Sequence, residues 1–226
     1  MLVLLGLGSW QLQRLQWKLG LIQRIAARVH APPVPLEDLL AAHTDGAVDV
    51  EYTHVTATGQ FHHDLERYLY ASGQNDWGWD VFTPLAMPGG QTVLVNRGYV
   101  PRQQLDRSLR QPGLPSGAVV VTALVRLAPG PPPWWAPRSD LRKQEWYWPE
   151  IADMAASLRP PPARPVTWLY LDADATSGAA PPAGGVTNLE LSNRHLEYAV
   201  TWFGFAVTLA IIYAIFVFRR LHGARG

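Results

Sequence analysis

The sequence predicts an α+β membrane protein in which two transmembrane helices, the first one truncated, flank a mainly antiparallel, β-barrel or sandwich-like extracytoplasmic domain. Three observations support this fold class. Residues 198–218 form an uncharged apolar run, about as long as the ~20 residues that a helix needs to cross a bilayer. Residues 2–8 are also apolar and lead into a segment whose leucines recur at helical spacing. Between these ends, short β-branched runs alternate with turn residues.

Composition narrows the possible functions. The chain has 226 residues and a net charge of +1, so it offers no electrostatic case for a nucleic-acid partner. It contains no cysteine, which excludes disulfides, thiol catalysis and thiolate metal sites. Hydrophobic residues make up 48% of the chain and ten residues are tryptophan, a residue enriched at membrane interfaces. Membrane lipids are therefore expected partners.

Residues 1–31 are predicted to form the C-terminal part of the first transmembrane helix and its amphipathic extension. The apolar run 2–8 is too short to span a bilayer alone, and the basic start of a signal peptide is missing. The beginning of this helix is therefore expected to precede Met1. Pro32 and Pro33 end the helix, because proline lacks an N–H group and restricts the residue before it.

Residues 32–177 are predicted to form the β-rich domain. The expected strands lie in VEYTHVTATGQF (50–61), RYLYAS (67–72), QTVLVNRGYVP (91–101), AVVVTALVRL (118–127) and VTWLYLD (166–172). A short helix is expected near Glu150–Leu158. The proline-rich stretch APGPPPWWAP (128–137) carries Trp134 and Trp135, which are expected either to be exposed or to pack across the open end of the domain.

The C-terminal segments are a Pro/Gly linker (178–190), the second transmembrane helix (191–220) and a cytoplasmic tail (221–226). The orientation follows from the flanking charges. The apolar run 198–218 is followed by three arginines, Arg219, Arg220 and Arg225. The charges before it, on Glu190, Arg194 and Glu197, roughly cancel. The positive-inside rule places the C-terminus in the cytoplasm and the β-rich domain in the periplasm. The basic residues of the first segment oppose this orientation, so additional positive charge is expected upstream of it.

One face of the first helix combines aromatic and basic residues. In GSWQLQRLQWK, Trp10, Arg14, Trp17 and Lys18 recur at i, i+4, i+7 and i+8. This pattern is typical of a membrane-interface belt, in which cations extend into water. It also fits a docking face for a partner helix or for the anionic edge of a cofactor.

The second helix begins with a histidine above an aromatic stripe. In SNRHLEYAVTWF, His195, Tyr198 and Trp202 fall at i, i+3 and i+7, on one face. A neutral imidazole beside flat aromatic rings is what an axial haem ligand requires. The alternative interpretation is again an interfacial belt, with a polar residue at the membrane surface.

Other motifs carry weaker signals. His62 and His63 would point to opposite faces of a strand, so with His54 they form no evident set of three metal ligands. Arg97 in VNRGYVP could reach a carboxylate or a propionate, or could simply end a strand. We find no general acid–base pair, nucleophile elbow or phosphate loop, so the chain is not expected to be an enzyme.

Three stretches in order resemble the Surfeit locus protein 1 family, the assembly factors of cytochrome c oxidase. They are LGSWQLQRLQWK (7–18), VLVNRGYVP (93–101) and NRHLEYAVTWFG (193–204). The resemblance covers nearly the whole chain. The sequence departs from the family pattern at Tyr99, where tryptophan is more frequent in the family.

The resemblance implies a role in maturing the haem-copper oxidase, by binding haem a and helping to insert it into subunit I. The histidine of the second-helix motif, His195 here, is the implied ligand of the haem iron. Tyr198 and Trp202 match aromatic positions of the same motif. For such a haem, the expected partners of the propionates near the headgroups are Arg14, Lys18 or Arg194, and Trp10 is a further candidate cofactor-binding residue. The implied location is a bacterial inner (plasma) membrane. The implied protein partners are oxidase subunit I and, as a further candidate, haem a synthase.

Two alternatives to haem delivery follow from the same residues. The first is a membrane scaffold or chaperone that stabilises nascent subunit I and binds no haem. The second is an anchored extracytoplasmic enzyme, which the absence of a catalytic constellation in the sequence disfavours. Replacing His195 with alanine distinguishes haem delivery from the scaffold, because only the first requires the imidazole.

Overall fold

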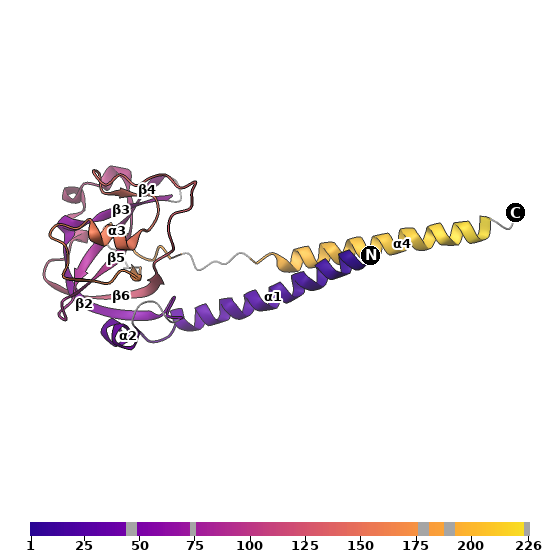
Figure 1. Ribbon diagram of the computed structural model, residues 1–226, viewed down its shortest axis with the longest axis horizontal. Helices are drawn as coiled ribbons and strands as arrows, with labels where there is room; N and C mark the ends of the chain where they lie inside the picture. The colour runs from indigo at the N-terminus through magenta and orange to yellow at the C-terminus, as the bar shows by residue number, and fades with distance from the viewer. Residues whose placement is uncertain (44–48, 73–75, 176–180, 188–192, 224–226) are drawn as a thin grey trace. The chain divides into compact units, whose positions relative to one another are not determined.

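The computed structural model describes residues 1–43, 49–72, 76–175, 181–187 and 193–223. Parts of the predicted linker and tail, residues 178–180, 188–190 and 224–226, lie outside this set. The chain divides into a helical unit, Met1–Ala27 with Asn188–Gly226, and a sheet unit, Arg28–Thr187. The two units are described separately (Figure 1).

The helical unit consists of α1 (Leu2–Val29) and α4 (His195–Gly223). Both helices lie where the apolar patterns predicted helices. Within the described residues, one helical segment, His195–Leu221, is long and apolar enough to cross a membrane. A second membrane span is not shown, because basic residues interrupt α1 from Arg14 onward and leave a short apolar run at its start.

Small residues bring α1 and α4 together (Figure 1). Gly8 of α1 is buried, and a Cβ atom at this position would lie 2.7 Å from the ring of Phe203 of α4. Ala199 and Ala206 of α4 are also buried. Small residues at a helix–helix contact allow the two backbones to approach closely, so these positions favour the pairing of α1 with α4.

The sheet unit is built around one mixed sheet. Among the described residues, nine strands are present: β1 (Val34–Pro35), β2 (His54–Phe61), β3 (Arg67–Ser72), β4 (Trp77–Ala86), β5 (Gln91–Pro101), β6 (Ala118–Leu127), β7 (Glu145–Trp146), β8 (Arg164–Pro165) and β9 (Leu169–Ala173). The strand order is β1-β2-β6-β9-β5-β4-β3-β7, with β8 beside β5. The long ladders β2–β6, β3–β4, β4–β5 and β6–β9 are antiparallel, as predicted. In addition, β2 pairs with β4 through Gln60 and Phe61.

Short helices complete the sheet unit. They are α2 (Leu36–Ala42), α3 (Ile151–Ala156) and the 3₁₀ helices η1 (His63–Leu65), η2 (Arg102–Gln104) and η3 (Arg107–Gly113). The short helix expected near Glu150–Leu158 is confirmed by α3. Helix α2 was not predicted; it follows a proline-rich stretch and begins directly after Pro35.

Two hydrophobic clusters cover both faces of β5. Val93 and Val95 belong to a cluster with α2, β2, β6 and β9, whereas Leu94 belongs to a second cluster with α3. A strand that is buried on both faces has a continuous apolar sequence, which explains the run VLV. The first cluster contains Leu36, Leu39, Leu40, Val55, Ala57, Leu85, Val93, Val95, Ala123, Val125, Leu169 and Leu171, among others. The second contains Phe82, Leu94, Trp146, Ile151, Met154, Ala155 and Tyr170.

Candidate functional site

His195 is the first residue of α4, and it contacts α1 through a polar side chain. Its Nδ1 atom lies 2.7 Å from Oε1 of Gln11. With the amide oxygen as the acceptor, Nδ1 is the donor of this hydrogen bond. Nε2 of the neutral imidazole then keeps its lone pair. Within the described residues Nε2 has no hydrogen-bond partner, so the structure leaves it available to a ligand.

Gln11 was not predicted to belong to the candidate site. Its signal is a polar residue at helical spacing within an otherwise small or apolar stripe, Gly8–Gln11–Leu15, at i, i+3 and i+7. All three side-chain positions are buried or half-buried in the helical unit. A glutamine in such a stripe requires a partner across the helix pair, and His195 is that partner.

The predicted aromatic companions of His195 lie on a neighbouring face of α4. Tyr198 is exposed, and Trp202 is half-buried with its ring edge-on to Phe205 at 6.2 Å. The stripe that faces α1 instead contains Ala199 and Phe203. His195 therefore lies where both stripes begin, and no described contact joins its imidazole to Tyr198 or Trp202.

The predicted residues of α1 lie on the exposed side of that helix. Trp10 is exposed, and the guanidinium of Arg14 stacks over the Trp17 ring at 4.0 Å. Arg14 forms no ion pair with a carboxylate of the described residues. Arg194, in contrast, is bound to Glu197 at 2.8 Å. Of these two arginines, Arg14 is thus the one whose charge is not neutralised by a neighbouring acid.

An apolar pocket of about 400 Å³ lies between the two helices, further along α4 than His195. Phe203, the nearest lining residue of α4, follows His195 by eight positions, which corresponds to about 12 Å of helix. The lining residues are Met1, Leu5, Phe203, Ala206, Val207, Ala210, Ile211 and Ala214. The helix pair therefore presents an imidazole at one end and an apolar pocket beyond it.

His54 and His63 form hydrogen bonds within the sheet unit. His54 Nε2 lies 2.8 Å from Asp174 Oδ2, and His63 Nε2 lies 3.0 Å from the carbonyl of Pro115. Burial acts to lower the pKa of His54, but the hydrogen bonds to Asp174 and to the Ala31 carbonyl outweigh it and raise the pKa. Across the described ranges, no group of three or more His, Asp or Glu residues could hold a metal ion.

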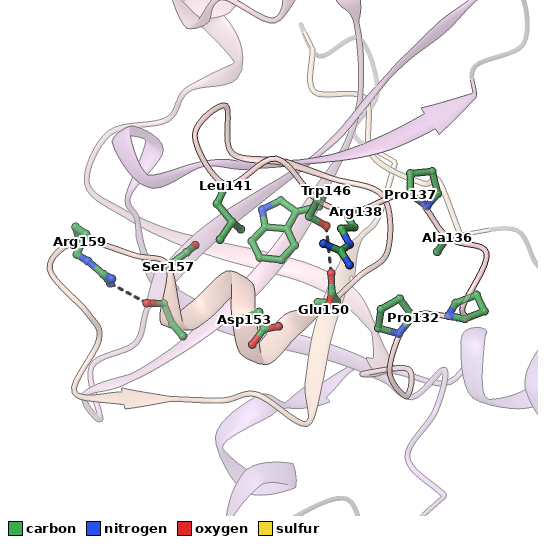
Figure 2. Close-up of a pocket in the computed structure, with 13 residues that line it drawn as sticks. Pro132, Ala136, Pro137, Arg138, Leu141, Trp146, Glu150, Asp153, Ser157 and Arg159 are labelled. Carbon is green, nitrogen blue, oxygen red and sulfur yellow. Dashed lines mark hydrogen bonds between the residues drawn. The ribbon is translucent and has the colours of Figure 1, made fainter.

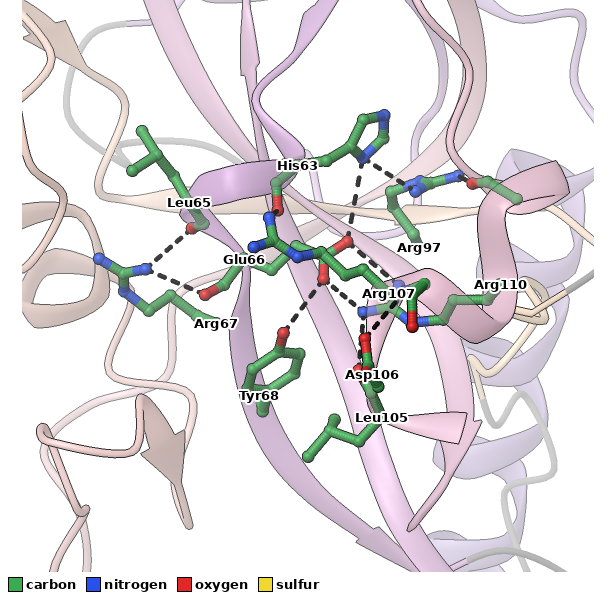
Figure 3. Close-up of polar contacts among 12 residues, drawn as sticks. His63, Leu65, Glu66, Arg67, Tyr68, Arg97, Leu105, Asp106, Arg107 and Arg110 are labelled. Carbon is green, nitrogen blue, oxygen red and sulfur yellow. Dashed lines mark hydrogen bonds and ion pairs between the residues drawn. The ribbon is translucent and has the colours of Figure 1, made fainter. Parts of the chain in front are cut away.

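A buried ion pair lies beneath η3 (Figure 3). Glu66 and Arg110 are each about 1% exposed, and their closest oxygen and nitrogen atoms are 2.5 Å apart. Arg110 donates two hydrogen bonds to Glu66, and the Tyr68 hydroxyl donates a further one at 3.2 Å. Nearby, Arg97 donates to the Gly113 carbonyl and stacks over Phe61 at 4.8 Å, and burial lowers its pKa to about 10. Arg97 thus has a structural role in the sheet unit.

A second polar network crosses β5, β6 and β9. Asn96 donates to Asp172 Oδ1 at 2.9 Å, and Arg126 donates to Asp172 Oδ2 at 2.9 Å. Asp80 of β4 interacts electrostatically with the carboxylate of Asp172. Burial and that charge raise the pKa of Asp80 to about 6.

Replacing Asp80 with asparagine is expected to stabilise the protein at neutral pH and not in acid. An unfolded aspartate titrates near ~3.9, so between about pH 4 and 6 the folded state binds more protons than the unfolded state. The free energy of unfolding therefore falls as the pH rises through this window. Asp80→Asn removes this fall. The difference in the free energy of unfolding between the variant and the unchanged protein should therefore be roughly 1–3 kcal/mol more favourable to the variant at pH 8 than at pH 4. Melting temperatures at pH 4, 6 and 8 measure this difference, and Asp64→Asn, which removes an exposed carboxylate, is the control.

The proline-rich loop lies beside a groove of about 630 Å³ (Figure 2). The groove is lined by Trp146 and by Glu150, which accepts a hydrogen bond from Ser139 at 3.1 Å. Trp134, on the loop, is 95% exposed, and Trp135 is also exposed. Of the two arrangements expected for this Trp pair, the structure therefore shows the exposed one.

Together these features define a protein with one candidate membrane helix, a strand-rich domain and a helix pair that presents a histidine. The SURF1 family model matches residues 1–207. Surfeit locus protein 1 of Mus musculus is 32% identical over 225 residues, covering 92% of this chain and 70% of the relative. The Homo sapiens protein is 33% identical, covering 92% and 72%, and that of Takifugu rubripes is 32% identical, covering 94% and 92%. The chain belongs to the SURF1 family, which confirms the resemblance found in its three motifs.

Proposed function

We propose that this protein is an assembly factor for haem-copper cytochrome c oxidase, which binds haem a through His195 and assists its insertion into subunit I. Family membership supports the role in assembly. The 2.7 Å hydrogen bond between His195 and Gln11 is the single observation that supports haem binding. It fixes the tautomer and the orientation of the imidazole, as second-shell partners of metal-binding histidines do.

The residues of the helix pair fit a haem group. Bound haem would supply an iron atom that accepts the lone pair of Nε2. The Gln11 amide oxygen would accept a hydrogen bond from Nδ1, which turns the ring and leaves Nε2 to the iron. The apolar pocket between the helices suits the apolar part of the cofactor, and Arg14 suits a propionate. Tyr198, Trp202 and Trp10 would cover the outer faces of the ring. One exchangeable ligand also favours release to the oxidase.

We further propose that both helices lie in the membrane, with the apolar start of α1 packed against α4. The C-terminus is then cytoplasmic and the sheet unit periplasmic, in a bacterial plasma membrane. Within the sheet unit, the β2–β4 pairing supports closure of β2, β6, β9, β5 and β4 into a barrel. Oxidase subunit I and haem a synthase are the proposed partners.

Replacing His195 with alanine is expected to abolish most haem binding. The variant is co-expressed with the enzymes that make haem a, purified in detergent, and its haem absorbance per protein is compared with that of the unchanged chain. We expect a loss of at least about tenfold, because the only proposed iron ligand is gone. Gln11→Leu keeps the ligand but removes its orienting partner, so it should weaken binding by about tenfold.

The exposed His30 provides the matched control, since His30→Ala removes an imidazole elsewhere in the chain. Its haem content should equal that of the unchanged protein. Full haem absorbance in His195→Ala would contradict the proposed ligand. If His195→Ala also supports normal oxidase assembly, the function is that of a scaffold that stabilises subunit I without haem.

A further inference from the structure

Two tryptophans stand in water at the tip of the proline-rich loop. Trp134 is 95% exposed, more than any other large hydrophobic side chain of the described sheet unit, and Trp135 is 66% exposed. Tryptophan is a large, mostly buried residue in proteins, so a neighbouring pair with this exposure indicates a surface that meets something else. Neither indole lines the groove of Figure 2, and neither takes part in the proposed haem site. We call residues 133–136 the tryptophan turn.

The tryptophan turn presents these rings on a fixed backbone. The N–H group of Ala136 donates to the Pro133 carbonyl at 2.9 Å, which closes a β-turn with the two tryptophans at its central positions. Near the start of the loop, Nε1 of Trp148 donates to the Gly130 carbonyl at 2.9 Å. Prolines on both sides of the turn restrict the backbone further. Ordering the turn on a binding surface therefore costs little conformational entropy.

The chemistry of the loop suits the region between lipid headgroups and hydrocarbon. An indole combines an apolar body with an N–H donor, and tryptophan is enriched at that depth of the membrane. Residues 128–137 contain no charged side chain, so their insertion transfers no charge out of water. Five of these ten residues are prolines, which have no N–H group, and the Ala136 N–H is already bonded within the turn. Few backbone donors would therefore lose their water.

The chain itself supplies a bilayer near this loop. Helix α4 is a candidate membrane span, and we have proposed that it lies in the membrane. Seven residues, 188–194, separate the sheet unit from His195, the first residue of α4. An extended chain covers at most about 3.6 Å per residue, so this linker spans no more than about 30 Å. A short tether gives the loop a high effective concentration at the bilayer surface.

We propose that the tryptophan turn inserts into the headgroup region of the bilayer that holds α4, and thereby fixes which face of the sheet unit meets the lipid. Side chains of both signs follow the uncharged run, namely Arg138, Asp140, Arg142 and Lys143. The attraction therefore comes from the two indoles and not from anionic lipids. This insertion rests on the proposed placement of α4 in the membrane and is independent of haem binding.

Spin-label accessibility tests the proposal on the full-length chain in vesicles of phosphatidylcholine, a neutral lipid. The chain contains no cysteine, so a cysteine introduced at one position carries the only label. Ala136→Cys places the label in the turn and keeps both tryptophans. Gly89→Cys is the matched control, because this position is exposed and has open space around it. We expect the Ala136 label to collide with a water-soluble nickel complex at least about threefold less often than the Gly89 label.

Substitutions of the two indoles show whether they cause this shielding. With Trp134→Ser and Trp135→Ser in the same chain, the Ala136 label should become as accessible to nickel as the Gly89 label. With Trp134→Tyr and Trp135→Tyr the shielding should remain, because tyrosine also favours the membrane interface. Both tryptophans are exposed, so neither pair of substitutions removes packing from the core.

A label on α4 separates this proposal from the placement of the helix. Ile212→Cys lies at an exposed position of α4 and should be shielded from nickel in every variant. If the Ile212 label is shielded and the Ala136 label is not, insertion of the turn is wrong and the membrane placement of α4 stands. If both labels are accessible, both proposals are wrong. Shielding of Ala136 that survives the serine substitutions would overturn the role of the indoles. Shielding that appears only at high protein-to-lipid ratios would assign the turn to a second copy of the chain and would also overturn the proposal.

Discussion

Replacing Glu66 with glutamine is expected to lower the free energy of unfolding by about 3–5 kcal/mol, the usual cost of removing one partner of a buried ion pair. The variant leaves the Arg110 guanidinium with a positive charge inside the sheet unit and no carboxylate to balance it. The Nε–H group of Arg110 already has no hydrogen-bond partner among the described residues. The arginine therefore has few acceptors that could replace the lost carboxylate. The Tyr68 hydroxyl also loses a charged acceptor. Chemical denaturation at pH 7 measures the loss.

Two controls separate the ion pair from the shape of the side chain. Asp49→Asn weakens an exposed ion pair with Arg28 and should cost about 0–1 kcal/mol. The double variant Glu66→Leu with Arg110→Met removes both buried charges and should recover most of the stability, because apolar residues of similar size replace buried pairs well. A double variant as unstable as Glu66→Gln would show that the ion pair is not the cause.

The pH dependence gives an independent check on Glu66. Burial acts to raise its pKa, but hydrogen bonds from His63 and Arg110 and the charge of Arg110 outweigh it, so the pKa is lowered. Because the pKa of Glu66 is lower in the folded state, its carboxylate stabilises the fold fully at pH values above the pKa of an unfolded glutamate, about 4.3. This stabilisation is lost as the pH falls through the folded pKa. The difference between the unchanged protein and Glu66→Gln should therefore shrink in acid.

The strands that the sequence predicted best are those with strong local patterns. RYLYAS and AVVVTALVRL coincide with β3 and β6, because aromatic and β-branched residues dominate them and turn residues bound them. β4 was missed, since Gly78, Asp80 and Pro84 give WGWDVFTPLA the appearance of a loop. Its ladders with β3 and β5, not its own propensity, make it a strand.

In the candidate site, too, local sequence patterns identified single residues but not their distant partners. His195 was selected because an imidazole before an apolar helix is a local signal, but its partner Gln11 is 184 positions away. Glu66 and Arg110 are 44 positions apart, and no local pattern distinguishes them from solvated charges. Long-range polar pairing depends on how the elements pack, which the sequence of one chain does not display directly.

Replacing Gly98 with alanine is expected to destabilise the sheet unit by about 3–5 kcal/mol, because it combines backbone strain with overpacking. Gly98 has a φ of +111°, a conformation that residues with a Cβ atom rarely adopt. An added Cβ would lie 1.8 Å from the Ala183 carbonyl oxygen. That segment is held in place by reciprocal backbone hydrogen bonds of 3.0 Å between Tyr99 and Ala183, so it cannot move away without losing them.

Two other glycines separate the strain from the overpacking. Gly90 also has a positive φ, +78°, but an added Cβ would contact nothing within 4 Å, so Gly90→Ala should cost only about 1–2 kcal/mol. Gly89 has neither feature, and Gly89→Ala should be nearly neutral. Chemical denaturation of the three variants should rank the losses as Gly98, then Gly90, then Gly89. A loss at Gly98 no larger than that at Gly90 would show that the 183–185 segment yields to the added methyl group. The glycine of the VNRGYVP motif would then be required for its backbone angle alone.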